Sequence, residues 1–282
     1  MLSGQVLLSL SQLLNISKRI TLMLTSLSKA VGMIDDGSLV CFSGNLLYRI
    51  PAAFAREMAR QKKKDLILMK TAGGYDIDLL CAFDCVREVR AGFVSFEGFG
   101  LAKNFRRSVE EGKVKFAEHT CYTIIASLRA AAYGIPFMPI ADISKSYFVE
   151  ERGFKWVENP YDGGEILTVP AIKPDYAVIH VQKADEHGNA LIYGPWFEDV
   201  LMCRAAKNVI ITAEMVVPKE ELKREIDAVW IPSYKVKAVV EMPKGAYPGC
   251  CPPYYDIDFD AVEEYLSLDR DGLFKHVEEV NP

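Results

Sequence analysis

The chain has 282 residues, of which 50% are hydrophobic and 25% charged, with a formal net charge of -5. This is the composition of a globular protein that is long enough to bury a substantial core. Because the only basic block is the short run Lys62-Lys63-Lys64, which is typical of a solvated helix end, we expect no nucleic-acid partner.

The N-terminal segment 1–24 contains an apolar run that Asn15, Lys18 and Arg19 interrupt. It falls short of the roughly 20 apolar residues that a membrane span needs. A signal peptide has positively charged residues before its apolar run, and this segment has none. We expect an N-terminal extension or amphipathic helix, no membrane association, and one compact domain over 25–282.

Short, continuous apolar runs recur along the chain and predict buried strands. Helical patterns that end on lysine or glycine lie between several of them. The predicted strands are 38–44, 65–74, 86–96, 136–142, 175–185, 208–216 and 238–243, and the predicted helices are 50–64, 104–113, 123–134 and 197–207. This alternation predicts an α/β fold with an open, mostly parallel sheet and helices on both faces.

Ligands of such sheets bind beyond the carboxyl ends of the strands. Glycines there let the backbone approach a ligand and direct amide N–H groups at an anion. The turns at these ends contain Gly44 with Asn45, Gly73 with Gly74, and Gly98. We therefore predict that these five residues bind substrate.

Glu97 is a carboxylate at the end of a predicted buried strand, between Phe96 and Gly98. Such a group must be paired, solvated in a cleft, or raised in pKa. One interpretation is a salt bridge to Arg106 or Arg107. The other is a functional carboxylate, and the residues alone leave both open.

Other common motifs are absent from the sequence. The seven cysteines are scattered and form no CxxC…CxxC frame, so we expect no metal site and reduced thiols in the cytoplasm. The segment "HVQKADEHGNA" favours a tight turn over a ligand role for His187. The sequence has no P-loop, no GxSxG elbow and no dinucleotide fingerprint.

Several segments occur in an order that resembles a known family. They are "VCFSGNLLYRIP", "TAGGYDIDLL", "GFVSFEGFGLAKNFRRSVEEGKV", "LRAAAYGIPFMPI", "ENPYDGGEILTVPAIKPDYAVIHVQKADEHGNALIYG" and "VEMPKGAYPGCCPPYYDID". Together they resemble the A subunit of the family I CoA-transferases, and most of all the glutaconate CoA-transferase type.

The resemblance implies an enzyme that works only beside a B subunit, with an acyl-CoA and a carboxylic acid as substrates. It also implies that the B subunit provides the nucleophilic glutamate, and that coenzyme A takes part as the substrate thioester without a metal. Arg49 then has two interpretations: a guanidinium that pairs with a substrate carboxylate or a CoA phosphate, or a salt bridge.

At Glu97 the chain departs from the glutaconate type, which has a small hydroxyl residue there. A carboxylate would repel an anionic substrate, so glutaconate itself is not expected. Glutamate is similar to a sister branch, the two-subunit hydrolases that open a ring of a steroid-derived CoA thioester. In that alternative Glu97 is a general base in an apolar pocket that raises its pKa. A non-catalytic binding or regulatory protein on a related scaffold is the third alternative.

Overall fold

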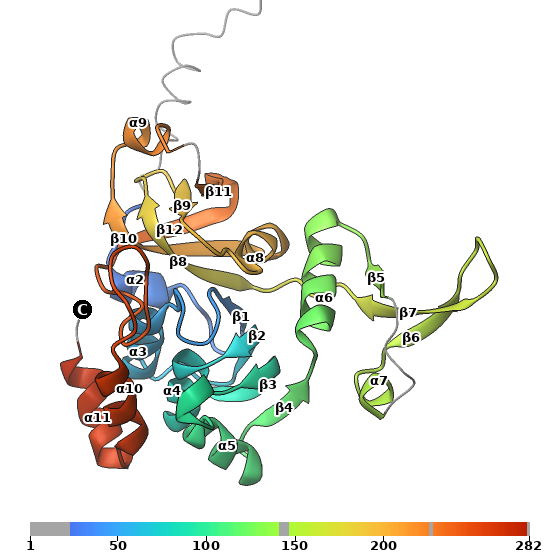
Figure 1. Ribbon diagram of the computed structural model, residues 1–282, viewed down its shortest axis with the longest axis horizontal. Helices are drawn as coiled ribbons and strands as arrows, with labels where there is room; N and C mark the ends of the chain where they lie inside the picture. Colours follow the sequence, from blue (N-terminus) through green and yellow to red (C-terminus); the bar gives the residue numbers. More distant parts are fainter. Residues whose placement is uncertain (1–22, 141–146, 226–227, 281–282) are drawn as a thin grey trace, which may run out of the picture.

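The computed structural model describes residues 23–140, 147–225 and 228–280, so the predicted extension lies almost entirely outside the described residues (Figure 1). Seven parallel strands form the body of a nine-stranded sheet. Their order is β4 (Lys115–Glu118), β3 (Val86–Val94), β2 (Leu66–Gly73), β1 (Leu39–Phe42), β8 (Tyr176–Ala184), β10 (Asn208–Val216) and β12 (Val236–Glu241). The antiparallel strands β9 (Ala190–Ile192) and β11 (Val229–Ile231) extend it beside the end of β8.

The sheet separates two hydrophobic cores, because successive side chains of a strand point to opposite faces. In β1, Val40 and Phe42 enter one core and Cys41 enters the other. The first core contains residues of α2 (Leu27–Gly32), α3 (Ala52–Arg60), α4 (Tyr75–Ala82), α5 (Lys103–Glu110), α10 (Phe259–Ser267) and α11 (Arg270–Glu279). The second contains residues of α6 (Cys121–Tyr133) and α8 (Asp199–Ala205). The predicted fold class is confirmed.

A second, antiparallel sheet stands beside the main one and packs against α6 (Figure 1). It consists of β5 (Phe137–Ile140), β7 (Glu165–Pro170) and β6 (Lys155–Glu158), with α7 (Tyr147–Glu151) between β5 and β6. The prediction that 136–142 is a strand buried on both faces was wrong, since Phe137 is 44% exposed and β5 pairs antiparallel with β7. Residues 141 and 142 lie outside the described residues.

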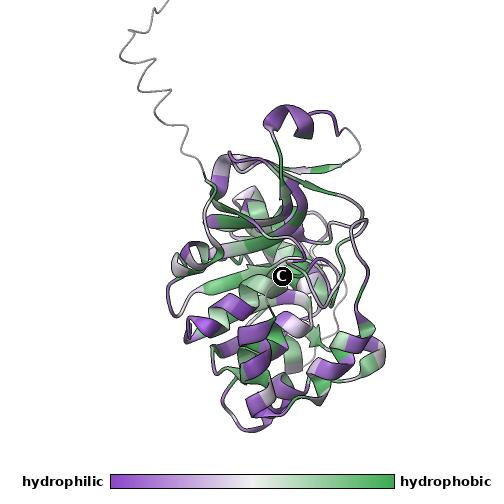
Figure 2. Cartoon of the chain, turned by 90° about the vertical axis from the view of Figure 1, so that its left-hand side faces the viewer, coloured by the Kyte–Doolittle hydropathy of each residue, from purple (hydrophilic) through white to green (hydrophobic). Residues whose placement is uncertain are grey.

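Hydropathy follows the layers, with hydrophobic strands inside and helices that alternate hydrophobic and hydrophilic residues outside (Figure 2). The remaining short elements are α9 (Lys219–Leu222) and the 3-10 turns η1 (Glu97–Phe99) and η2 (Ser233–Lys235). Within the described residues, no helix is both long enough and apolar enough to span a bilayer.

Candidate active site at the carboxyl edge

The strands β1, β2 and β3 are parallel neighbours, so their carboxyl ends lie along one edge of the sheet, which we call the carboxyl edge. The turns with Gly44 and Glu97 come shortly after the ends of β1 and β3, whereas Gly73 is itself the last residue of β2 and Gly74 follows it. The structure therefore brings the predicted substrate-binding turns to neighbouring positions, where the edge of a parallel sheet binds ligands.

The turn after β1 requires glycine at position 44. Gly44 has φ +73°, and a Cβ there would lie 2.1 Å from the carbonyl oxygen of Tyr48. Its N–H donates to Oδ1 of Asp199 at 3.1 Å. The N–H of Asn45, which is half-buried, donates to the carbonyl of Tyr48 at 3.0 Å. Gly44 is thus enclosed by its own chain, and Asn45 is the more accessible of the two residues.

Arg49 lies in the same turn, and its side chain is completely buried. Nη2 lies 2.6 Å from Oδ2 of Asp199, at the start of α8. Nη1 donates to the carbonyl of His180 at 2.9 Å, and Nη2 also donates to the carbonyl of Pro195 at 2.8 Å. Of the two interpretations of Arg49, this geometry favours the salt bridge, in buried form, and the guanidinium ties the turn to α8.

Gly73 and Gly74 are close to other parts of the chain. A Cβ on Gly73 would lie 2.4 Å from Cδ1 of Ile77, and one on Gly74 would lie 2.7 Å from the carbonyl oxygen of Leu46. Their small size therefore lets the start of α4 and the turn after β1 pack together. Nothing lies within 4 Å of a Cβ built on Gly98, which is exposed.

Glu97 is exposed and has φ +54°, an uncommon conformation for a residue with a side chain. In the described part of the chain it forms no ion pair: Arg106 pairs with Glu110 and Arg107 donates to Asn104. The salt-bridge interpretation is thus not realised here. Nor does this chain by itself enclose Glu97 in the expected apolar pocket.

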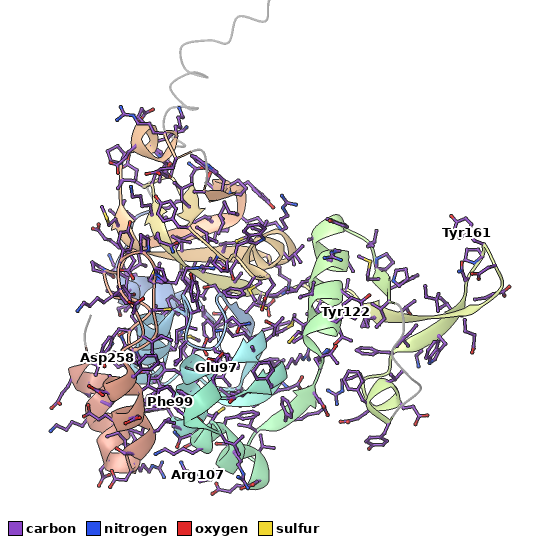
Figure 3. The ribbon with its side chains drawn as sticks, viewed as in Figure 1. Glu97, Phe99, Arg107, Tyr122, Tyr161 and Asp258 are labelled. Carbon is purple, nitrogen blue, oxygen red and sulfur yellow. The ribbon has the colours of Figure 1, made fainter. Side chains whose placement is uncertain are left out.

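Two aromatic side chains fix the turn that carries Glu97. Phe96 is fully buried, with its ring centroid 5.8 Å from that of Tyr265. Phe99, which is labelled near Glu97 in Figure 3, has its ring centroid 5.6 Å from that of Phe259. Because both partners belong to α10, this helix holds the Glu97 backbone in place while the carboxylate stays accessible.

Sequence reasoning missed a buried carboxyl group, Glu198, which directly precedes α8. It is 3% exposed and accepts hydrogen bonds from the N–H and the hydroxyl of Thr71 on β2. Burial raises the pKa of Glu198, and the neighbouring charge of Asp199 adds to this effect. Acidic residues at a helix start are common, so the sequence held no signal that distinguishes this one.

A second missed group is the buried network around Glu214 of β10. Its Oε1 lies 2.8 Å from Nε2 of His180 and accepts from the hydroxyl of Tyr255, while Oε2 accepts from the N–H of Lys244 at 2.7 Å. Burial raises the pKa of Glu214, but the hydrogen bonds and the charge of His180 outweigh it and leave the pKa lowered. Cys251 lies close enough for a shared metal, yet hydrogen bonds already occupy the carboxylate and the imidazole.

The network anchors the loop 242–256, which in turn holds the turn after β1. The N–H of Arg49 donates to the carbonyl of Cys250 at 2.8 Å. The N–H of Cys250 donates to the carbonyl of Leu47 at the same distance. The backbone at the carboxyl edge is therefore fixed from two sides, by α8 and by this loop.

Comparisons with known proteins agree with the resemblance. The coenzyme A transferase family model matches residues 24–242. The chain is 31% identical over 255 residues to the A subunit of glutaconate CoA-transferase from Acidaminococcus fermentans, a match that covers 84% of this chain and 80% of that protein. It is 32% identical over 246 residues to the cholesterol ring-cleaving hydrolase IpdA subunit of Mycobacterium tuberculosis (83% and 84%). A longer Archaeoglobus fulgidus protein is 35% identical over 239 residues, and the match spans 84% of this chain but only 54% of that protein.

Solved structures show the same relationships. The glutaconate coenzyme A-transferase from Acidaminococcus fermentans superposes with a TM-score of 0.84 at 29% identity, over 91% of this chain and 88% of that one. A variant of the decarboxylase AibA/AibB gives a TM-score of 0.83 at 31% identity, over 90% and 96%. One scaffold therefore serves proteins named for transfer, hydrolysis and decarboxylation.

Proposed function

Since this chain belongs to the coenzyme A transferase family, we propose that it is the A subunit of a two-subunit enzyme that moves CoA between an acyl-CoA and a carboxylic acid. In the B subunit, a glutamate attacks the thioester and releases the CoA thiolate, which leaves an acyl-glutamyl anhydride. The thiolate then attacks the anhydride, forms glutamyl-CoA and frees the first acid. Covalent catalysis of this kind divides one acyl exchange into easier steps. Coenzyme A enters as substrate, and no metal takes part in this proposal.

The geometry of Glu97 is the observation in this chain that best supports the proposal. Its carboxylate is accessible, free of an ion pair within the described residues, and held on a backbone with positive φ at the carboxyl edge. Uncommon backbone conformations cluster at functional sites, where surrounding packing maintains them. Here the packing of Phe96 and Phe99 against α10 does so. In the proposed complex Glu97 and Gly98 face the acyl group, with Asn45 beside them.

Gly44, Gly73, Gly74 and Arg49 act in this proposal by shaping the edge. Their atoms are enclosed by the chain, so they set the backbone path and leave substrate contact to their neighbours.

All seven cysteines are unpaired, which supports the proposed location in the reducing cytoplasm.

Glu97 also supports a second candidate function, hydrolysis with Glu97 as general base. An accessible carboxylate can accept a proton from water, provided that the B subunit supplies the apolar surroundings this chain lacks. The two functions differ in the fate of oxygen. If the complex hydrolyses its substrate in ¹⁸O-labelled water, the label appears in the product. If the complex transfers CoA instead, ¹⁸O from a labelled acceptor acid appears in the acid that is released.

We expect this chain to be inactive by itself, because the proposed nucleophile belongs to the B subunit. The test is to assay acyl-CoA exchange with the chain alone and with the chain assembled with its B subunit. Activity only in the complex supports the proposal. Full transferase activity of the chain alone contradicts it, and an assembled complex without any acyl-CoA chemistry favours the third alternative, a regulatory scaffold.

A further inference from the structure

A cavity of about 430 Å³ lies between the edge strands of the main sheet and the segment that contains α7 and β7. Its lining includes Arg90 of β3, Lys115 of β4 and Arg152, which follows α7. Arg90 lies in the middle of β3, whereas Glu97 follows the end of this strand. The cavity, which we call the basic cleft, is therefore separate from the carboxyl edge.

The charges of the basic cleft leave one cation uncompensated. Nε of Arg90 lies 2.6 Å from Oε1 of Glu88, and Arg152 pairs with Glu151. Lys115 has no ion-pair partner within the described residues. These three cations and two carboxylates give the lining a net charge of +1. A positive cleft attracts anions and concentrates them locally.

His119 contributes no charge to this sum at neutral pH. It lines the same cleft, and its ring centroid lies 6.0 Å from that of Phe154. Burial, together with the nearby Arg152 and Arg90, lowers the pKa of His119 to about 4. Burial is the main cause of the lowered pKa, and the two arginines add to it, so His119 stays neutral in the cleft.

The strongest indication of a missing ligand is Arg152. Its side chain is only 9% exposed, yet within the part of the chain that the structure describes its Nε is buried without a hydrogen-bond partner. Buried polar groups are normally hydrogen-bonded, so an orphaned guanidinium N–H calls for an acceptor. A planar guanidinium presents parallel N–H groups that match two oxygens of a phosphate or a carboxylate.

We propose that the basic cleft binds an oxyanion of the phosphate type, held by Arg90, Lys115 and Arg152. Arg90 and Arg152 are each shared with a carboxylate and Lys115 is not, so the three cations can together donate to several oxygens of one such group. The group could come from a free phosphate-type anion or from the phosphates of a CoA thioester, and only the second source rests on the proposed function. The test separates these sources.

The experiment measures binding of inorganic phosphate and of adenosine 3′,5′-bisphosphate, the nucleotide end of CoA, by calorimetry. It uses the full chain, alone and assembled with its B subunit. We expect saturable binding that Arg152→Leu and Lys115→Met each weaken at least tenfold. Lys115 is exposed, so we expect Lys115→Met to fold, and this variant still tests the proposal if Arg152→Leu does not fold. The matched control is Arg87→Leu, which removes the same charge from an exposed position on the same strand as Arg90.

Binding of both probes supports a general phosphate-type site, and binding of the bisphosphate alone supports CoA as the source. Absence of saturable binding for both probes overturns the proposal, and so does equal weakening by Arg87→Leu. Binding to the chain alone that disappears on assembly also overturns it, because an acidic group of the partner then occupies the cleft. None of these measurements needs acyl-CoA turnover, so they stand apart from the test of the proposed function.

Discussion

At the scale of single residues, two carboxyl groups near the carboxyl edge have opposite surroundings. Glu97 is exposed and projects from a fixed turn, whereas Glu198 is buried and accepts two hydrogen bonds from Thr71. A negative charge on Glu97 stays in contact with water, whereas a negative charge on Glu198 would have to be buried, which is unfavourable. The first is therefore suited to contact substrate, and the second to hold β2 and α8 together.

Glu97→Gln keeps the size of the side chain and removes the proton acceptor. We expect kcat of the assembled enzyme to fall on the order of a hundredfold if Glu97 is the general base. Thermal stability should stay unchanged, because the side chain forms no ion pair within the described residues. Steady-state kinetics, pH–rate profiles and melting curves check this, with the exposed Glu263→Gln on α10 as control. A normal kcat and pH profile would exclude Glu97 from the chemistry.

Glu198→Gln should change how stability depends on pH. The raised pKa means that the folded chain holds this proton more tightly than the unfolded chain, where the pKa is near 4.5. The resulting stabilisation is present below that value and is lost as pH rises through the folded pKa. Glutamine still offers Thr71 an acceptor oxygen but never ionises. The Tm of the variant minus the Tm of the unsubstituted chain should therefore be larger at pH 8 than at pH 5. If this difference in Tm does not change with pH, the raised pKa of Glu198 is contradicted.

At the scale of elements, the carboxyl edge is built from turns whose backbones support one another. The turn after β1 is bonded to α8 through Asp199 and to the loop 242–256 through Cys250. The turn after β3 is packed against α10. Each turn is thus held by a helix or loop from a distant part of the chain, which makes the edge rigid before substrate arrives.

Alanine at Gly44 and at Gly98 should separate structural glycines from accessible ones. Gly44→Ala places a Cβ against the Tyr48 carbonyl and forces a left-handed backbone, which by itself costs roughly 1–2 kcal/mol. We expect a clearly lower Tm. Gly98→Ala meets open space, so its Tm should be unchanged, and any rise in KM then reports on substrate contact. Equal melting temperatures for the two variants would contradict the described turn.

At the scale of the whole molecule, the buried His119 and the half-buried His276 couple folding to pH. Burial lowers the pKa of both His119 and His276 to about 4, and nearby arginines contribute. His276 bonds to the hydroxyl of Tyr75 and so joins α11 to α4. His119 lies at the basic cleft, on the other side of the main sheet.

We expect the free energy of unfolding to fall as pH is lowered from about 6.5 towards 4. In that window the unfolded chain binds protons on both histidines and the folded chain does not, so stability rises with pH. Urea denaturation at pH 7 and pH 5 measures this difference. His119→Gln should reduce it, and an unchanged difference in that variant would show that His119 is not buried in the neutral form.

Local pattern by itself determined part of the main sheet and its helices, because apolar runs and glycine turns reflect interactions between near neighbours. It predicted β1, β2, β3, β8, β10 and β12 with the helices α3, α5, α6 and α8, but it missed β4, β9, β11, α2, α4, α10 and α11. It also predicted which turns meet at the carboxyl edge, since parallel strands share their direction. The family resemblance came from the order of such segments and is confirmed by the match over residues 24–242. The sequence patterns did not reveal which strands are neighbours, such as β8 beside β1.

Only the tertiary structure decided how Arg49 and Glu97 are surrounded. Arg49 meets Asp199, and Phe99 meets Phe259, across long stretches of chain, and no local period encodes such contacts. The antiparallel placement of β5 was missed for the same reason: a short apolar run looks alike in either sheet. The pairing of distant segments depends on the packing of the whole core, and that packing buries Arg49 and leaves Glu97 exposed.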